Sequence, residues 1–313
     1  MKRVEVLNSH VTTTRRVGIV GYGKVGSFLV EKIIEHQNHA VKTSSVPRMV
    51  LAFVVDLFDP KAVEKSTSIP EDCKSYTLDN FFDRYRADLV VEVAHPDISK
   101  RYGAKILQSS DFLIASTTAF ADKETEKSLQ DAVATNPLAR GIYLTVGALY
   151  GAFDLKKMSD AGQLRRLQVT MTKHPLSLYP EPGTPEHAAN EAAKIHDGPV
   201  VLYKGPIRRL AAVCPRNVNT LCTAALAAIK TTGMDHTEGV LVADRSLMDM
   251  IIEVKAEGPA RPKDGGPGLR IDVTRRNPSE PGEVTGMATF QSFYASLLRV
   301  ASSPSQGRGV HLA

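Results

Sequence analysis

The sequence predicts an α/β protein with two domains: a doubly wound parallel sheet over residues 1–160 and an α+β domain over residues 161–313. In the first half, short apolar runs typical of buried strands alternate with helical segments, which is the pattern of parallel βαβ units with right-handed crossovers. From about Leu164 the strand-like runs change in character and predict an antiparallel or mixed sheet. A chain of 313 residues is also long enough for about two domains.

The first strand ends in a glycine-rich turn, Gly21-Tyr22-Gly23-Lys24-Val25-Gly26. In this GxGxxG spacing the first glycine allows the tight bend, the second lets a phosphate approach the backbone, and the third lets the next helix pack on the strand. Hydrophobic residues at helical spacing predict that helix over residues 24–35, with its N-terminal N–H groups facing the phosphates. The turn therefore predicts a Rossmann-type dinucleotide-binding domain. The alternative is a glycine-rich turn in an α/β domain that binds no nucleotide.

The second strand, over residues 49–56, ends in an aspartate. A carboxylate at this position can accept hydrogen bonds from the ribose of adenosine. Asp56 lies farther from the glycines than the usual interval of about 20 residues, which we attribute to a longer connection over residues 37–47. Because a carboxylate repels a 2′-phosphate, Asp56 favours NAD. Lys61 and Arg48 leave NADP as the alternative cofactor.

Small or polar residues follow the other strands of the first domain. In a parallel sheet the carboxyl ends of the strands share one edge, and ligands bind in the crevice beyond it. Short side chains at that edge leave room for a nicotinamide nucleotide. Besides the glycine turn and Asp56, we therefore assign to the cofactor site the strand-end residues Ala94, Ser116, Thr117 and Ala148.

The same patterns predict the remaining elements. Further helices are expected over residues 61–65, 78–85, 99–109, 123–134, 219–230 and 290–300, and strands of the second domain over residues 167–172, 200–203, 239–244, 250–255 and 269–273. We expect a hairpin loop over residues 258–268. The final helix is expected to pack back on the first domain, and residues 302–313 to form a loose tail.

The overall composition argues against several classes of protein. Lys and Arg, which give a formal charge of +5, are scattered along the chain, so no basic stripe predicts nucleic-acid binding. The three cysteines have no CxxC spacing, which predicts reduced, buried thiols and neither disulfides nor a metal site. No apolar run reaches the roughly 18 residues of a membrane span. We expect a cytoplasmic protein that acts on a small molecule and forms a homodimer through its second domain.

Several segments, in this order, resemble the L-aspartate dehydrogenase family. Besides the glycine turn they are IASTTAFAD over residues 114–122, GALYGAFD over residues 147–154, PRNVN over residues 215–219 and VAD over residues 242–244. The resemblance implies NAD-dependent oxidative deamination of L-aspartate to iminoaspartate, and then to oxaloacetate and ammonia. It also implies that Ala148 and Asn219 contact the dinucleotide. Of Asn217 and Asn219, we expect one to cap the following helix and the other to face the ligand.

The chain departs from the family at one position. The family's proposed catalytic histidine lies several residues after the VAD strand, and counting from Val242 places Ile252 there, or Ile251 with a one-residue shift. Isoleucine cannot transfer a proton. We therefore expect His95, which directly follows a strand of the first domain, to be the substitute catalytic residue.

Other side chains are candidates for binding the substrate. His174, beside Lys173, and Arg216 are assigned to the substrate site, and Arg208 and Arg209 are further candidates because guanidinium groups pair with carboxylates. Two alternatives to the aspartate reaction stay open. One is another amino-acid or imine oxidoreductase with the same two domains, such as one resembling homoserine dehydrogenase or dihydrodipicolinate reductase. The other is a dinucleotide-binding protein without catalytic activity.

Overall fold

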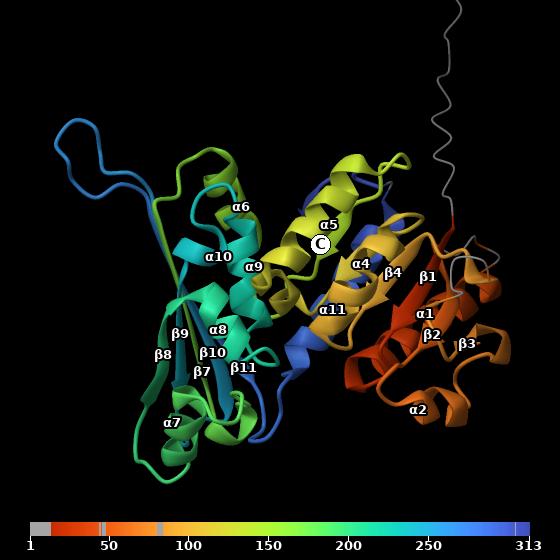
Figure 1. The fold of residues 1–313 in the computed structure, drawn as a ribbon, viewed down its shortest axis with the longest axis horizontal. Helices are drawn as coiled ribbons and strands as arrows, with labels where there is room; N and C mark the ends of the chain where they lie inside the picture. The colour runs from red at the N-terminus through yellow and green to blue at the C-terminus, as the bar shows by residue number, and fades with distance from the viewer. Residues whose placement is uncertain (1–13, 44, 46–47, 80–83, 304) are drawn as a thin grey trace, which may run out of the picture.

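The computed structural model describes residues 14–43, 45, 48–79, 84–303 and 305–313, which form two sheets with their helices side by side (Figure 1). The first sheet has the strand order β12-β6-β5-β4-β1-β2-β3, and its strands are parallel. Its strands are β1 Arg15–Val20, β2 Met49–Val55, β3 Lys74–Ser75, β4 Leu89–Glu92, β5 Asp111–Ile114, β6 Ile142–Leu144 and β12 Val310–Leu312. The predicted doubly wound domain is confirmed.

Helices cover both faces of this sheet. One face packs on α1 Lys24–Lys42 and α11 Met287–Ser302, and the other on α4 Pro96–Leu107 and α5 Lys123–Thr135. The rings of Phe28 in α1 and Phe290 in α11 meet edge to face, with centroids 5.6 Å apart. The C-terminal helix thus lies against the first domain. The shorter helices of this half are α2 Pro60–Lys65, η1 Glu71–Cys73 and η2 Thr117–Ala121.

Two predictions about connecting segments were wrong. Residues 37–42, expected in a loop, extend α1 by more than a turn, because Ala40 continues the buried stripe that Leu29 and Ile33 begin. The C-terminal tail is not loose, since β12 adds a parallel strand to the edge of the sheet at β6. The side chain of Leu312, in β12, is buried. The helix expected over residues 78–85 falls partly outside the described residues.

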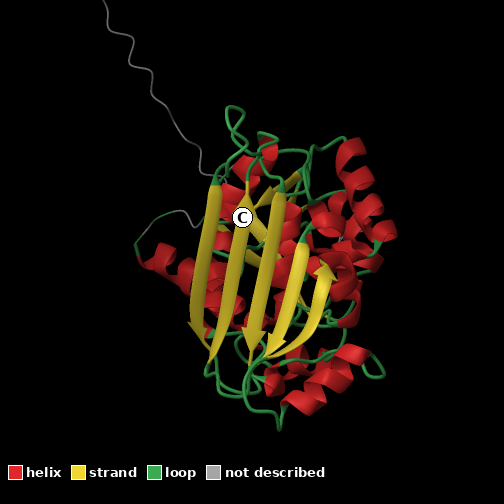
Figure 2. Ribbon diagram, turned by 90° about the vertical axis from the view of Figure 1, so that its left-hand side faces the viewer, coloured by secondary structure: helices red, strands yellow, loops and turns green. Residues whose placement is uncertain are grey.

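The second sheet is mixed and has the order β11-β10-β7-β9-β8. Its strands are β7 Arg166–Lys173, β8 Val200–Pro206, β9 Glu238–Ala243, β10 Asp249–Glu257 and β11 Arg270–Pro278. Helices cover one face only, and Figure 2 shows the five strands with no helix in front of them on the other face. The helices of this half are α6 Ala152–Asp160, η3 Pro175–Ser177, α7 Pro185–Ala193, α8 Ile207–Val213, α9 Asn219–Ala227 and α10 Gly233–His236.

The chain crosses between the two sheets twice. It leaves the first sheet after β6 and returns through residues 279–286, which join β11 to α11. We call residues 279–286 the return crossover. Both crossings lie next to the carboxyl edge of the first sheet, which is the edge where the strand-end residues of the predicted crevice meet. Side chains along β7 and β10 alternate between the two faces of the second sheet, and those of Met171 and Met250 point toward the covered face.

Candidate functional site

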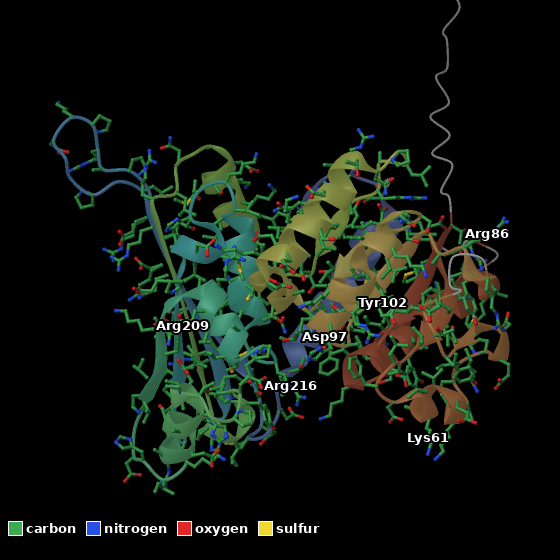
Figure 3. All side chains as sticks on the ribbon, viewed as in Figure 1. Lys61, Arg86, Asp97, Tyr102, Arg209 and Arg216 are labelled. Carbon is green, nitrogen blue, oxygen red and sulfur yellow. The ribbon has the colours of Figure 1, made fainter. Side chains whose placement is uncertain are left out.

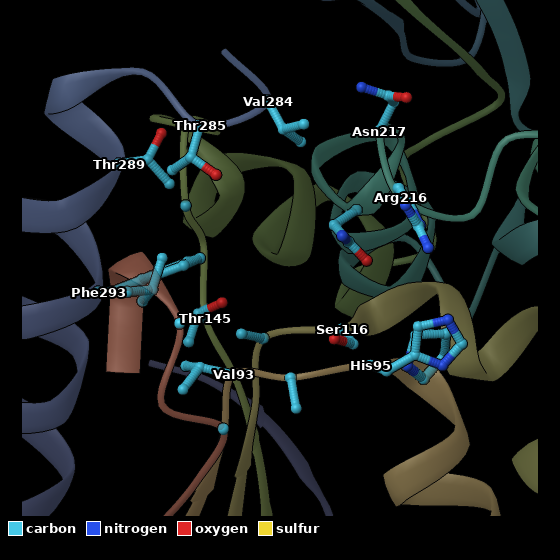
Figure 4. A pocket seen from close by; sticks show the side chains of 18 of the residues that line it. Val93, His95, Ser116, Thr145, Arg216, Asn217, Val284, Thr285, Thr289 and Phe293 are labelled. Carbon is cyan, nitrogen blue, oxygen red and sulfur yellow. The ribbon is translucent and has the colours of Figure 1, made fainter. Parts of the chain in front are cut away.

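A cavity of about 590 Å³ lies between the carboxyl edge of the first sheet and the second domain. On the first-domain side its lining includes Gly21, Gly23, Val25, Asp56, Ala94, His95, Ser116 and Gly147. The second domain contributes Met171, Arg216, Asn217, Asn219 and Met250, the segment before α11 contributes Val284 and Thr285, and α11 itself contributes Thr289 and Phe293. Figure 4 shows Arg216 and His95 facing each other on one side of the cavity, with Thr285, Thr289 and Phe293 on the other.

Gly21 and Gly26 have the tight-turn and close-packing roles that the sequence predicts, and the phosphate role of Gly23 stays a prediction. Gly21 has a φ of +106°, and a Cβ there would lie 2.8 Å from the Cβ of Ala94. A Cβ at Gly26 would overlap the carbonyl oxygen of Gly21. At Gly23, by contrast, a Cβ would meet no atom within 4 Å. The glycines at 21 and 26 are therefore required by the fold itself, whereas the open space at Gly23 is free for a ligand.

The N-terminus of α1 has no side chain that would satisfy its first amide groups. Gly23 is the N-cap residue, makes no side-chain cap, and no acidic residue lies in the first turn. Such an end attracts anions through its unpaired N–H groups and its dipole. Lys24 adds a positive charge and lies 3.6 Å from Glu283 of the return crossover. The residues present thus fit a dinucleotide pyrophosphate at this position.

Asp56 organises the loops around the glycine turn. Its Oδ2 accepts a hydrogen bond from the backbone N–H of Tyr22 at 2.7 Å, and its Oδ1 accepts from those of Phe58 and Asp59 at 2.9 Å. A carboxylate can accept about four hydrogen bonds, so about one acceptor position on Oδ2 remains for a ribose hydroxyl. The side chain that was expected to bind the ribose therefore also holds the turn in place.

The structure shows where the two basic residues that could favour NADP, Arg48 and Lys61, lie relative to Asp56. Arg48 precedes β2 and Asp56 follows it, so about eight strand residues, or roughly 26 Å, separate them. Arg48 therefore lies at the opposite edge of the sheet and cannot contact a 2′-phosphate beside Asp56. Lys61, the second residue of α2, lies at the same edge as Asp56, but its side chain points into solvent (Figure 3). Asp59, a second carboxylate, lines the cavity near Asp56.

Glu92 is a functional residue that the sequence reasoning missed. It ends β4, is fully buried, and its two carboxylate oxygens accept hydrogen bonds from Ala94 N at 2.7 Å and from Ser116 N and Oγ at 2.9 Å. Ala94 and Ser116 both line the cavity. Burial raises the pKa of Glu92 above its ordinary value, although the donors around it oppose that shift. One buried carboxyl group thus fixes the loops that follow two neighbouring strands.

His95 lines the cavity as well as capping a helix. Its Nδ1 accepts a hydrogen bond from the backbone N–H of Asp97 at 3.3 Å, at the N-terminus of α4. In the neutral ring the proton is then on Nε2, which makes that atom a donor. The ring also packs against Phe58, with centroids 5.6 Å apart. Phe58 lines the cavity too, and the catalytic assignment of His95 stays a prediction.

Asn219 joins the two domains at the cavity. Its Oδ1 accepts hydrogen bonds from the N–H and hydroxyl of Thr118, both at 3.1 Å, and its backbone oxygen accepts from Thr117 Oγ1 at 2.7 Å. Its Nδ2 makes no hydrogen bond to the described residues and remains available to a ligand. Thr117 is fully buried and, unlike Asn219 and Ser116, does not line the cavity. Lys24 and Ala148 also lie outside the lining, although Gly147 beside Ala148 belongs to it.

Neither asparagine of the PRNVN segment caps a helix, so that part of the prediction was wrong. The N-cap of α9 is Val218, which makes no side-chain cap. Asn217 instead bridges to another segment, since its Oδ1 accepts from Tyr179 N at 2.8 Å and its Nδ2 donates to Ser177 O at 2.7 Å. Asn217 therefore holds the loop that follows β7 against the start of α9.

Of the candidate substrate cations, Arg216 faces the cavity. It lies at the junction of the two domains, whereas Arg209 lies out on the second domain (Figure 3). Arg208 is fully engaged elsewhere, because it pairs with Glu126 and Asp235 and donates to two backbone oxygens of η2. His174 caps η3 through Nδ1 and does not line the cavity.

The position of the family histidine lies beside the cavity. Ile252 is 1% exposed, points to the covered face of the second sheet, and pairs across the strands with Met171. Both Met171 and Met250 line the cavity, so a side chain at 252 is next to its wall. Ile251 points to the uncovered face by the alternation of the strand. The residue that replaces the histidine is thus an apolar core residue without acid–base chemistry.

Lys173 holds the return crossover over the cavity. It is 1% exposed, and its Nζ donates to the backbone oxygens of Glu283 at 3.2 Å and Val284 at 2.7 Å. Val284 and Thr285 line the cavity. The sequence indicated Lys173 only as a neighbour of His174, because nothing in the local pattern shows that a lysine at a strand end is buried.

The buried amine predicts a pH effect on stability. Burial lowers the pKa of Lys173 from 10.5 to about 8. Between these values the unfolded chain holds a proton that the folded protein lacks, so stability rises with pH through this window and is lost as the pH falls through about 8. At about 1.4 kcal/mol per pH unit, the rise is about 3 kcal/mol. Urea unfolding from pH 8 to 10.5 should show this rise in the wild type relative to Lys173→Met; equal slopes would contradict it.

The cysteines and the metal-binding side chains add no chemistry to the cavity. All three thiols are free and buried, as expected, and burial raises their pKa values, to about 11 for Cys73 and about 12 for Cys214. Within the described ranges, His, Cys, Asp and Glu form no group of three that could hold a metal ion. No helix in the same ranges is long and apolar enough to cross a membrane.

Comparison with known proteins identifies the family. The chain is 39% identical over 285 residues to an aspartate dehydrogenase domain-containing protein of Xenopus tropicalis, an alignment that covers 90% of this chain and 93% of the relative. The chain belongs to the aspartate dehydrogenase family. The family described as aspartate dehydrogenase, C-terminal, matches residues 154–297, and the NAD-binding domain of homoserine dehydrogenase matches residues 21–138. The resemblance inferred from the motifs is confirmed.

More distant members of the aspartate dehydrogenase family agree with this assignment. The L-aspartate dehydrogenase of Methanocaldococcus jannaschii is 27% identical over 218 residues, which are 68% of this chain and 74% of that protein. The crystal structure of aspartate dehydrogenase from Thermotoga maritima has a TM-score of 0.62 at 20% identity, with 94% of this chain and 99% of that chain covered. At that identity the likeness establishes the fold. The chain is thus an NAD(P)-binding member of an oxidoreductase family.

Proposed function

We propose that the protein oxidises L-aspartate with NAD and releases oxaloacetate and ammonia. One observation carries the proposal: the open N-terminus of α1 faces the cavity from one domain, and Arg216, whose guanidinium pairs with none of the described residues, faces it from the other. A dinucleotide and an anionic amino acid would therefore share one space. NAD, when bound, supplies an acceptor for the hydrogen on Cα of the amino acid.

NAD is the proposed cofactor rather than NADP. Asp56 and Asp59 both line the cavity beside the glycine turn, and two carboxylates repel the 2′-phosphate of NADP. Arg48, which would have offset that repulsion, lies at the other edge of the sheet. The free Nδ2 of Asn219 is a suitable donor to the carboxamide of a nicotinamide ring.

The substrate is proposed to bind through Arg216 and His95. A guanidinium pairs with a carboxylate through two parallel hydrogen bonds, and Arg216 is the arginine that lines the cavity within the described residues. His95 is the histidine that lines the same cavity, and its Nε2 can donate to a ligand while Nδ1 stays in the helix cap. We therefore propose His95 as the group that replaces the family histidine in proton transfer.

The proposal is tested by mixing purified protein with NAD and L-aspartate and following the absorbance of NADH. We expect turnover in the wild type, and in His95→Ala a loss of turnover of at least about tenfold with a much smaller change in NAD affinity. His174→Ala is the matched control, because His174 caps a helix in the same way but does not line the cavity. An unchanged rate in His95→Ala would remove His95 from the mechanism.

A second candidate function is nucleotide binding without catalysis. The observation that favours it is Ile252, a buried apolar residue at the position of the family's histidine. In that case NAD would bind with ordinary affinity, while a broad panel of amino acids over a range of pH values would yield no NADH. The same assay therefore separates the two candidates.

We further propose that the protein is a homodimer formed through the uncovered face of the second sheet. That face carries Val240 and Val242 together with polar residues of β7 and β10, and no helix of the described chain covers it (Figure 2). Val240 and Val242 are each 8% exposed, so what supports the proposal is the open face of the sheet itself, on which the same face of a second copy could pack. Light scattering that gives the mass of a monomer would contradict this proposal.

A further inference from the structure

Four buried polar atoms at the end of β11 have no hydrogen-bond partner among the described residues. They are Arg275 Nη1, Asn277 Nδ2, Asn277 Oδ1 and Ser279 Oγ, at the end of β11 and just beyond it. The residues alternate along the chain and so point to the same, covered side of the second sheet. Asn277 and Ser279 are each 7% exposed. Buried polar atoms are almost always paired, so such a group calls for a partner that the chain does not supply.

These side chains lie directly behind the wall of the cavity. Asn277 pairs across the strands with Met250, which lines the cavity, and Arg275 pairs with Ile252, the position of the family histidine. The amide of Asn277 also lies against Gly286, where a Cβ would come within 2.7 Å of Nδ2. Thr285, the residue before Gly286, lines the cavity. Asn277 thus lies next to Met250 and next to the return crossover, both of which contribute to the lining of the cavity.

The chemistry of the group suits an anion. It offers hydrogen-bond donors from a guanidinium, an amide and a hydroxyl, and among the described residues Arg275 forms no ion pair. The guanidinium instead stacks on the ring of Tyr150, 5.0 Å from its centroid. Burial lowers the pKa of Arg275, as expected for a cation without a counter-ion. A carboxylate would satisfy these donors and supply the missing negative charge.

We propose that Arg275, Asn277 and Ser279 form a carboxylate-binding subsite that opens onto the cavity when the side chain of Met250 moves aside. Methionine is unbranched and adapts readily to a new neighbour, so it is suited to such a movement. This inference rests on the proposed function, because it assigns the subsite to the side-chain carboxylate of a dicarboxylic amino acid. It leaves Arg216, on the opposite side of the cavity, for the other carboxylate.

The test measures binding rather than turnover. Succinate, a four-carbon dicarboxylate without an amino group, is titrated into full-length protein saturated with NADH and followed by calorimetry, with butyrate as the monocarboxylate. The variants are Arg275→Met and Asn277→Leu. Arg276→Met is the matched control, because Arg276 is the adjacent arginine on the opposite face and is 63% exposed. Arg275→Lys, which keeps the charge, is used if Arg275→Met does not fold.

We expect wild type to bind succinate more tightly than butyrate. Each of the two variants should weaken succinate binding by about tenfold or more, because each loses one charge-assisted or buried hydrogen bond. Arg276→Met should bind succinate as the wild type does. The affinity for NADH should be the same in all variants. Asn277→Leu should also fold with an unchanged or higher Tm, because it removes two unpaired buried atoms. A residue that only supported the fold would lower the Tm when replaced.

Two results would overturn the subsite. The first is that both variants bind succinate as tightly as the wild type, which is expected if a buried water satisfies these atoms. The second is that the wild type binds no dicarboxylate. The proposed function fails separately. If succinate binds through Arg275 but L-aspartate yields no NADH, the subsite stands and the aspartate reaction does not. If L-aspartate is oxidised with the same KM in the variants, the reaction stands and the subsite does not.

Discussion

Replacing Gly23 with valine is expected to weaken NAD binding about a hundredfold and to leave the Tm of the free protein unchanged. The backbone at Gly23 has a φ of −74° and a ψ of −163°, an extended conformation that valine adopts readily, and a Cβ there meets no atom within 4 Å. The side chain would instead occupy the space in which a pyrophosphate approaches the N-terminus of α1. The loss of two charge-assisted hydrogen bonds, about 1.5 kcal/mol each, weakens binding by about two orders of magnitude.

The matched variant is Gly26→Ala, which places its Cβ on the carbonyl oxygen of Gly21. Because backbone atoms cannot move aside as a flexible side chain can, this change should destabilise the fold by about 3 kcal/mol or more. Calorimetric titration with NAD and thermal unfolding of both variants separate the two roles. Retained NAD affinity in Gly23→Val would show that the pyrophosphate does not bind at this turn.

Replacing Glu92 with leucine is expected to have the second large effect, a loss of about 3 kcal/mol in the free energy of unfolding. The substitution leaves three donors, the N–H of Ala94 and the N–H and hydroxyl of Ser116, without their acceptor, and each unpaired buried group costs about 1–3 kcal/mol. NAD affinity should fall as well, because Ala94 and Ser116 line the cavity. Urea unfolding and calorimetric titration measure the two effects.

Glu92→Gln, which keeps the shape and removes the charge, tests the electrostatic part. Burial raises the pKa of Glu92 in the folded protein above the ordinary value of 4.5. A group with a raised pKa contributes stability that is fully present below its unfolded value and is lost as the pH rises through its folded value. The stability of wild type relative to Glu92→Gln should therefore fall as the pH rises from 4.5. A difference that stays constant with pH would contradict the raised pKa.

The parts of the fold that follow from local patterns could be predicted from the sequence. The glycine turn is one, because its requirements for a positive φ at Gly21 and for close packing at Gly26 depend on a few neighbouring residues. The order of strands and helices in the first domain is another. Asp56 was also found, since the carboxyl end of β2 is defined by the apolar run before it.

Features that depend on contacts between distant segments could not be predicted. Glu92 ends an apolar run and resembles a solvated strand end until β5 brings Ser116 beside it. Asn219 holds Thr117 and Thr118 over a separation of more than 100 residues. The expected loop was wrong over residues 37–42, because their polar composition concealed the buried residue Ala40, which continues the helix. Such signals exist only in the folded chain.

The second-domain wall of the cavity is the part of the site that local sequence patterns predict least. The second-domain wall comes from β7, β10, the segment at the start of α9 and the return crossover, which are distant in sequence. Local patterns indicated Arg216 and Lys173 but not that Lys173 is buried or that Arg275 and Asn277 lack partners. A family histidine would have marked this wall directly. We expect Ile252, or Ile251, at the position of that histidine, and either residue would leave the chemistry to other groups.

Transfer of deuterium tests the central claim most directly. The protein is incubated with NAD and L-aspartate that carries deuterium at Cα, and the reduced nucleotide is analysed by mass spectrometry. If the cavity holds both molecules and passes the Cα hydrogen between them, the reduced nucleotide should contain one deuterium, and Gly23→Val should yield none. Unlabelled NADH, or NAD that binds at the glycine turn while no deuterium reaches it, would contradict the account.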